Sequence, residues 1–233
     1  MPPFSSDPCL FRRRRKEARP AELLDAALTL FVEKGFAATR SEEVAKAAGV
    51  SKGTLYLYFP SKEELLKAVI QHFLVNEITA GVEEAAAAAD GPTHQMMADL
   101  LVPWWTRAYE GPASGVFKLV VTEVRNFPEI AQFFSERVVN PGEALVRGLL
   151  QRGVERGEFQ DVDIDAAVHS ILMPMILLCV HKHTLGMCGS GAHDVNDDPI
   201  GFMKAHLQLI FKGLEARPAE ARRVIDGKAR SAA

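Results

Sequence analysis

The chain has 233 residues, of which 48% are hydrophobic and 24% charged, and its formal net charge is −3. This length holds a small domain plus one larger domain with its own apolar core, and the weak negative charge excludes a protein that coats nucleic acid along its whole surface. Three irregularly spaced cysteines, Cys9, Cys179 and Cys188, exclude a disulfide framework.

The chain opens with a basic run, Arg12 to Lys16, followed by Arg19. We expect residues 1–19 to form a disordered basic arm. The arm either contacts DNA phosphates or an adjacent minor groove, or it is a solubilising tail with no fixed contact. The start lacks the apolar stretch of a signal peptide, and the longest apolar run, 171–180, is too short to span a bilayer. A soluble, cytoplasmic protein is therefore expected.

Residues 20–66 carry the signals of three short helices. The first is predicted over 20–34, where apolar residues recur at intervals of three and four, and Gly35 suits a left-handed helix cap. Ser41 is the predicted N-cap of the second helix, and Gly49 permits a sharp turn before a third helix over 52–59. This order is that of a helix-turn-helix, which places its last helix in the major groove of DNA.

The third helix has the composition of a groove-reading helix. Leu55 and Phe59 are four residues apart and are expected to face the small core, so that Thr54, Tyr56 and Tyr58 point outward with their hydroxyl groups. The alternative is a small helical subdomain whose tyrosines and lysines are merely solvated.

The segment resembles the DNA-binding domain of the TetR family, the tetracycline-repressor-like regulators of bacteria. The residues that carry the resemblance are Ala26 to Phe31, Lys34-Gly35-Phe36, Thr39, Val44-Ala45, Ala48 to Tyr56, Tyr58-Phe59 and Ser61 to Leu65. The resemblance implies an all-helical homodimer that binds a palindromic operator and is released when a small molecule fills a C-terminal pocket.

The resemblance also implies the DNA contacts by motif position. Phosphate contacts would come from Thr39, Arg40, Ser51, Lys52, Tyr58 and Lys62, and groove contacts from Gly53, Thr54 and Tyr56. Leu57 departs from the polar residue that many members carry. It could only pack against a thymine methyl group, so it is not assigned a polar contact.

The rest of the chain is predicted to be helical, which makes the fold all-α with about nine helices. The further helices are expected over 61–84, 93–109, 113–126, 129–156 with an interruption at 140–142, 163–185 and 199–216, with a loop over 186–198. The predicted domains are a DNA-binding head over 20–66, a regulatory and dimerisation body over 67–216, and a tail over 217–233. Residues 1–60 carry a charge of +3 and residues 61–233 a charge of −6, which confines the expected DNA contact to one end.

The last two helices are apolar on nearly all sides and therefore need a second covering surface. The resemblance implies that they pair with their copies in a four-helix interface, and the alternative is ordinary core within one chain.

Met and aromatic residues of the body suit an adaptable apolar pocket, although core packing is the alternative for each. The candidates are Met96, Met97, Trp104, Trp105, Tyr109, Phe117, Phe127, Phe133, Phe134, Met173 and Met175, with Met97, Trp104, Phe117, Phe127 and Met173 preferred. Trp104 and Trp105 point about 100° apart on a helix, so we expect only one of them at any cavity wall.

Neither a metal site nor an enzyme is indicated. Cys179, His181, His183, Cys188 and His193 lie close in sequence but lack the spacing of structural zinc ligands. Ser, His and Asp within 189–194 lack the strand-turn-helix support of a nucleophile elbow. We therefore expect no cofactor and a dimeric repressor released by a small apolar or amphipathic ligand. The alternatives are an activator, or a helical binding or catalytic protein with a non-functional head.

Overall fold

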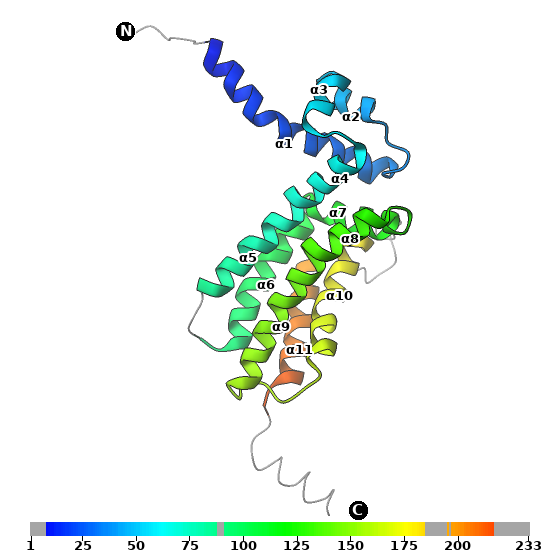
Figure 1. Ribbon diagram of the computed structural model, residues 1–233. Coiled ribbons are helices and arrows are strands. Elements are labelled where there is room, and N and C mark those ends of the chain that lie inside the picture. The colour runs from blue at the N-terminus through cyan, green and yellow to red at the C-terminus, as the bar shows by residue number, and fades with distance from the viewer. Residues whose placement is uncertain (1–7, 88–90, 185–194, 196, 217–233) are drawn as a thin grey trace, which may run out of the picture.

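Figure 1 shows the computed structural model of the chain, which describes residues 8–87, 91–184, 195 and 197–216. Its elements are α1 (Pro8–Lys34), α2 (Ser41–Ala47), α3 (Lys52–Tyr58), α4 (Lys62–Ile70), η1 (Gln71–Val75), α5 (Asn76–Ala87), α6 (Thr93–Glu110), α7 (Ala113–Glu123), η2 (Val124–Asn126), α8 (Pro128–Phe134), η3 (Ser135–Val139), α9 (Asn140–Glu155), α10 (Ile164–Lys182) and α11 (Pro199–Leu214). The predicted all-α fold is confirmed for these ranges. Because α4–η1–α5 and α8–η3–α9 run without a break, the described residues form nine continuous helices.

The head consists of α1, α2 and α3, and its ends follow the expected cap chemistry. Gly35 and Gly49 adopt positive φ angles of 85° and 66°, which a side chain would strain. Ser51 caps α3 by accepting a hydrogen bond from the backbone N–H of Thr54 at 3.1 Å. Phe36 folds back onto the end of α1 and lies edge-on to Phe31, with the ring centroids 5.2 Å apart.

Two sequence-based boundaries in the head were wrong. The first helix begins at Pro8 instead of Pro20, so residues 8–19 extend α1 beyond the head in place of the predicted disordered arm (Figure 1). The run of Arg, Lys, Glu and Ala favours a helix on both sides of Pro20. The N-cap of α2 is Arg40 instead of Ser41, which places Glu43 at the third helical position.

The body is a bundle in which α10 packs against α7, α9 and α11, while α6 contacts α5, α7, α9 and α11. The break predicted at 140–142 is absent, because the π-helical turn η3 precedes α9 and Pro141 falls in the first turn of that helix. A first-turn proline has no N–H to leave unpaired. The rod α4–η1–α5 runs from the head down one side of the body (Figure 1).

Head and body meet where the end of α1 packs against α7. Lys118 Nζ donates a hydrogen bond to the Val32 carbonyl at 2.9 Å. Phe36 contacts the body twice, through its N–H to Glu123 Oε1 at 3.1 Å and through its ring, which lies 4.7 Å from that of Phe127. The two parts are therefore held together by α7 as well as by the continuous α4–η1–α5 rod.

Several sequence-based expectations fall outside the described residues. They concern most of the predicted loop over 186–198 with Cys188, His193 and the Ser, His and Asp of 189–194, and the tail over 217–233.

Candidate nucleic-acid interface and internal cavity

The outward side of α3 is a continuous exposed surface. Leu55 is buried against the head, as its position in the sequence predicts, while Tyr56 is 40% exposed and Leu57 is 85% exposed. Gly53 is also exposed, and Thr54 is half-buried at the edge of this surface. The helix therefore presents an aromatic hydroxyl, an aliphatic side chain and an open stretch of backbone, which are groups that fit a major groove.

The polar residues at the start of α3 already have hydrogen-bond or ion-pair partners within the head. The hydroxyl oxygens of Ser51 and Thr54 lie 2.9 Å apart. Lys52 forms an ion pair with Glu42 on α2, and this hydrogen bond lowers the pKa of the Glu42 carboxyl. Both partners are exposed. A phosphate can therefore replace Glu42 as the partner of Lys52 without opening the fold.

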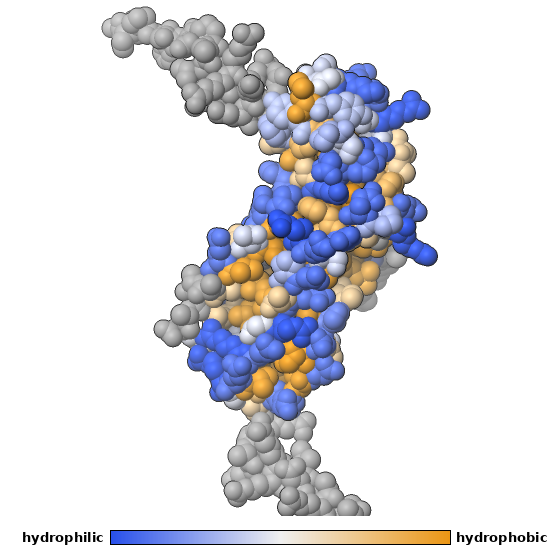
Figure 2. Space-filling view, in the orientation of Figure 1, coloured by the Kyte–Doolittle hydropathy of each residue, from blue (hydrophilic) through white to orange (hydrophobic). Residues whose placement is uncertain are grey.

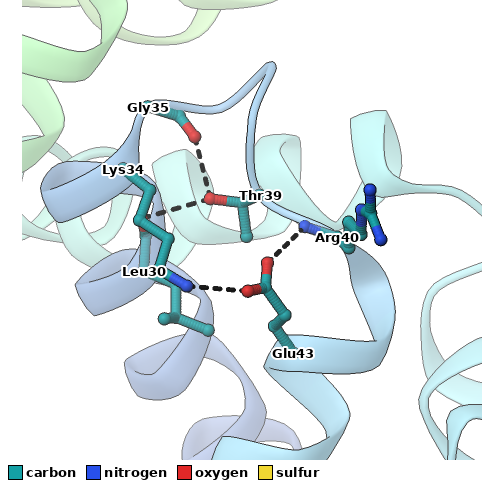
Figure 3. Close-up of polar contacts among 6 residues, drawn as sticks. All are labelled: Leu30, Lys34, Gly35, Thr39, Arg40 and Glu43. Carbon is teal, nitrogen blue, oxygen red and sulfur yellow. Dashed lines mark hydrogen bonds and ion pairs between the residues drawn. The ribbon is translucent and has the colours of Figure 1, made fainter.

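Two of the predicted phosphate contacts, Thr39 and Lys62, form hydrogen bonds within the head, and Figure 3 shows those of Thr39. Thr39 is 1% exposed, and its hydroxyl lies 2.8 Å from the Gly35 carbonyl and 3.1 Å from the Leu30 carbonyl. Lys62 Nζ donates to the carbonyls of Phe36, Ala37 and Thr39 at 2.9, 3.2 and 3.1 Å. An ammonium group has three donors, so these bonds use all of them. Both residues hold the α1–α2 loop in shape.

That loop presents Arg40, whose side chain is exposed. Its N–H donates to Glu43 Oε2 at 3.0 Å, and Glu43 Oε1 accepts from Lys34 Nζ at 2.7 Å (Figure 3). Tyr58, another predicted phosphate contact, is half-buried beside Phe59 at the end of α3. The structure thus brings the exposed predicted residues Arg40, Ser51, Lys52, Gly53 and Tyr56 to one end of the molecule, together with Leu57.

A cavity of about 270 Å³ lies in the body between α5, α6, α7, α8, η3, α9 and α10. Its lining residues include Ile78, Leu100, Leu101, Trp104, Trp105, Phe117, Phe134, Val138, Glu143, Val146, His169, Leu172, Met173 and Ile176. Three of the five preferred candidates, Trp104, Phe117 and Met173, line this cavity. Met97 is instead fully buried in the core, and Phe127 packs against Phe36 at the head.

We expected only one of Trp104 and Trp105 at any one cavity wall, and both residues line this cavity. Their rings are edge-on with centroids 4.8 Å apart, and Trp105 also packs against Phe117 at 5.7 Å. The sequence also missed Glu143 and His169, since nothing local distinguishes them from other polar residues on amphipathic helices.

Large apolar side chains are exposed on α10 and α11, and Figure 2 shows apolar side chains between polar ones on one face of the body. Leu177 on α10 and Leu209 on α11 are 66% and 70% exposed, and Met173 and Phe202 are also exposed. By length and composition alone, α10 passes the test for a membrane span, and 33% of that stretch is buried within the chain. A helix packed between its own core and a second protein surface has the same composition.

No group of three or more His, Cys, Asp or Glu residues suited to a metal ion occurs in the part of the chain that the structure describes. Cys179 is buried, and burial raises the pKa of its thiol to about 12, which leaves it protonated. Nε2 of His183 shares a 2.9 Å hydrogen bond with the Ser114 hydroxyl.

The sequence matches two family descriptions. Residues 23–69 match "Bacterial regulatory proteins, tetR family", and residues 97–185 match "Tetracyclin repressor-like, C-terminal domain". The HTH-type transcriptional regulator YfiR of Bacillus subtilis is 32% identical over 171 residues, which cover 70% of this chain and 78% of that protein. The HTH-type transcriptional repressor KstR2 of Rhodococcus jostii is 31% identical over 154 residues, covering 65% and 74%.

The fold also matches solved structures. The regulator FadR of Bacillus subtilis, solved in complex with stearoyl-CoA, superposes with a TM-score of 0.68 at 21% identity and covers 84% of this chain and 99% of that one. At this identity the likeness concerns the fold, in which a helix-turn-helix head is joined to a helical body.

Proposed function

The chain belongs to the TetR family of bacterial regulatory proteins and is a DNA-binding transcriptional regulator, and from this premise we propose that it is a dimeric, cytoplasmic repressor released from a palindromic operator by a small apolar or amphipathic ligand. The observation that carries the proposal is a continuous structural connection between the exposed helix α3 and the cavity of the body. An exposed reading helix is joined, through α4–η1–α5 and α7, to a body with an apolar cavity.

The DNA-binding surface of the proposal is the exposed side of α3 with the start of α2. Arg40, Ser51 and Lys52 contact phosphates, while Gly53, Tyr56 and the half-buried Thr54 and Tyr58 lie along the groove. Thr39 and Lys62 act mainly by holding the loop that presents Arg40, since their polar groups are paired with backbone carbonyls. Phosphate contacts position the protein, and groove contacts select the sequence.

Dimerisation follows from the size of the reading surface and from the exposed apolar side of α10 and α11. One short helix reads a half-site, and a second copy is needed about 34–36 Å away on the next turn of DNA. Leu177 and Leu209 are large aliphatic residues that gain from being covered by the same helices of a partner. The symmetry of such a dimer matches a palindrome.

Release is proposed to follow from ligand binding in the cavity of about 270 Å³. Its walls are almost entirely aliphatic and aromatic, which suits an apolar ligand or the apolar part of an amphipathic one. The stearoyl-CoA bound to FadR is a ligand of that second kind. Phe117 lines the cavity on α7, and the next residue, Lys118, holds the Val32 carbonyl at the end of α1.

A ligand that moves α7 or the α4–η1–α5 rod therefore changes the position of the head. It shifts the population away from the DNA-bound geometry by no more than its differential affinity for the two geometries. The test is a titration of the dimer on a labelled operator duplex, first alone and then with apolar ligands of increasing size. Release of the duplex in parallel with quenching of the cavity tryptophans supports the proposal, and quenching without release contradicts it.

A further inference from the structure

We propose that the effector carries a hydrogen-bond-donating, cationic end, a protonated amine on an apolar body, and that this end binds between Glu143 and His169 at the rim of the cavity. The inference rests on the proposed function only in taking this cavity as the effector site. It adds the chemistry of the ligand's polar end, which the apolar walls of the cavity do not specify.

Glu143 on α9 and His169 on α10 both line the cavity, and Nε2 of His169 lies 3.5 Å from Oε1 of Glu143. The other ring nitrogen, Nδ1, lies 2.8 Å from the carbonyl oxygen of Asp165. A carbonyl only accepts, so Nδ1 carries a proton, and in the uncharged ring with that tautomer Nε2 is an acceptor. Two acceptors then lie side by side where the cavity meets the surface, and an ammonium group next to the pair can donate one hydrogen bond to each.

The charge around the cavity favours a cation over an anion. No Lys or Arg occurs among the residues that line the cavity, within the part of the chain that the structure describes. Arg147, one turn along α9 from Glu143, is paired with Asp165 at 2.5 Å. The N–H of Trp105 has no hydrogen-bond partner among the described residues, but it is buried and inaccessible, so it supplies no donor at the rim. A carboxylate at the rim would therefore meet Glu143 without a compensating donor.

The position of the pair also fits the end of an amphipathic molecule. The side chains of His169 and Glu143 are 46% and 28% exposed, so a charged group bound there keeps part of its hydration. The apolar remainder would extend inward along Trp104 and Phe117. The arrangement therefore fits a single-ended ligand with its amine at the surface and its apolar body inside.

The experiment compares three ligands with the same ten-carbon chain, decylamine, 1-decanol and decanoate, below their micellar concentrations. Trp104 and Trp105 are the two tryptophans of the chain and both line the cavity, so intrinsic fluorescence reports occupancy. The full-length protein is expected to bind decylamine about tenfold more tightly than decanoate, with decanol between them, because hydrogen bonds to charged groups are stronger than neutral ones.

Glu143→Gln should remove the advantage of decylamine while leaving the affinity for decanol unchanged. Glu155→Gln, on the exposed side of the same helix, is the matched control and should leave the whole series unchanged. His169→Phe removes the acceptor nitrogen and should also weaken decylamine, so it serves if Glu143→Gln fails to fold.

Equal affinities, a preference for decanoate, or no fluorescence change with any of the three ligands would overturn the inference. If the protein still binds its operator in these cases, the repressor proposal stands. If the unmodified protein shows no sequence-specific DNA binding, the proposed function itself is overturned, whatever the ligand series shows.

Discussion

The backbone N–H of Phe36 in the DNA-binding head donates a hydrogen bond to Glu123 Oε1 of the body, with 3.1 Å between the two atoms. Phe36 is fully buried, its ring is 4.7 Å from that of Phe127, and Lys62 Nζ lies 4.5 Å above it. Glu123 ends α7, the helix whose Phe117 lines the cavity. One helix therefore both lines the cavity and contacts the loop that presents Arg40.

Glu123→Ala should weaken the coupling between cavity and head. The substitution leaves the part-buried Phe36 N–H without its acceptor, at a cost of about 1 kcal/mol in the free energy of unfolding. The expected result is a reduced effect of a cavity ligand on operator affinity, measured by fluorescence anisotropy with and without ligand. Glu123→Gln keeps an acceptor oxygen and should retain the response. An Ala variant with an undiminished response would exclude this contact from the relay.

Lys62→Ala should lower the melting temperature and weaken operator binding for all DNA sequences, because three loop carbonyls lose their donor. The salt dependence of binding should stay unchanged if Lys62 acts through the loop. Lys52→Ala, which removes an exposed side chain proposed to contact a phosphate, should instead reduce the slope of log affinity against log salt concentration by about one unit. A Lys62→Ala variant with normal stability and a reduced slope would restore Lys62 to the direct phosphate contacts.

Leu57→Ala should change operator preference at one position without loss of stability, because this side chain is 85% exposed. An aliphatic group in the major groove recognises the C5-methyl group of thymine. Replacing single thymines of the operator by uracil removes that methyl group and provides the matched control. At one position, uracil should weaken the unmodified protein and have no effect on the Ala variant. If every uracil substitution affects both proteins equally, Leu57 does not read the groove.

Stability should fall as the pH is lowered through the ordinary histidine pKa of 6.5, and His183 should contribute to the fall. Burial lowers the pKa of His183 in the folded state, with Lys182 and Lys118 adding to the effect. The unfolded chain then binds the proton more readily, so stability rises with pH across this window and is fully present above it. Melting temperatures at about pH 8 and about pH 5.5 should differ less for His183→Gln than for the unmodified protein. An identical difference in both proteins would contradict the assignment.

Leu209→Lys and Leu177→Lys should convert the proposed dimer to a monomer, because each places a charge on the exposed apolar side of α10 and α11. Sedimentation velocity measures the change directly. Lys204→Glu, which alters an exposed charge on α11, controls for general effects on solubility. A dimer that survives both Leu substitutions must use another surface of the chain.

The sequence predicted the parts of the fold that depend on local chemistry. Gly35, Gly49 and Ser51 act where backbone geometry or an orphan N–H requires those residue types, so their positions were informative. The roles of Thr39 and Lys62 depend on carbonyls up to 26 residues away, and a motif position does not reveal whether a polar group is already paired. The residues that line the cavity were harder to predict, because Met97 and Met173 have the same chemistry and differ only in whether their side of the helix faces the core or the cavity.

The most direct test is selection of bound duplexes from a random DNA library by the full-length protein, repeated at two salt concentrations. The account predicts a palindrome whose half-sites lie about one helical turn apart and which is recovered at both salt concentrations. Weak binding that disappears at the higher salt concentration and yields no consensus would contradict it, because phosphate contacts alone behave in that way.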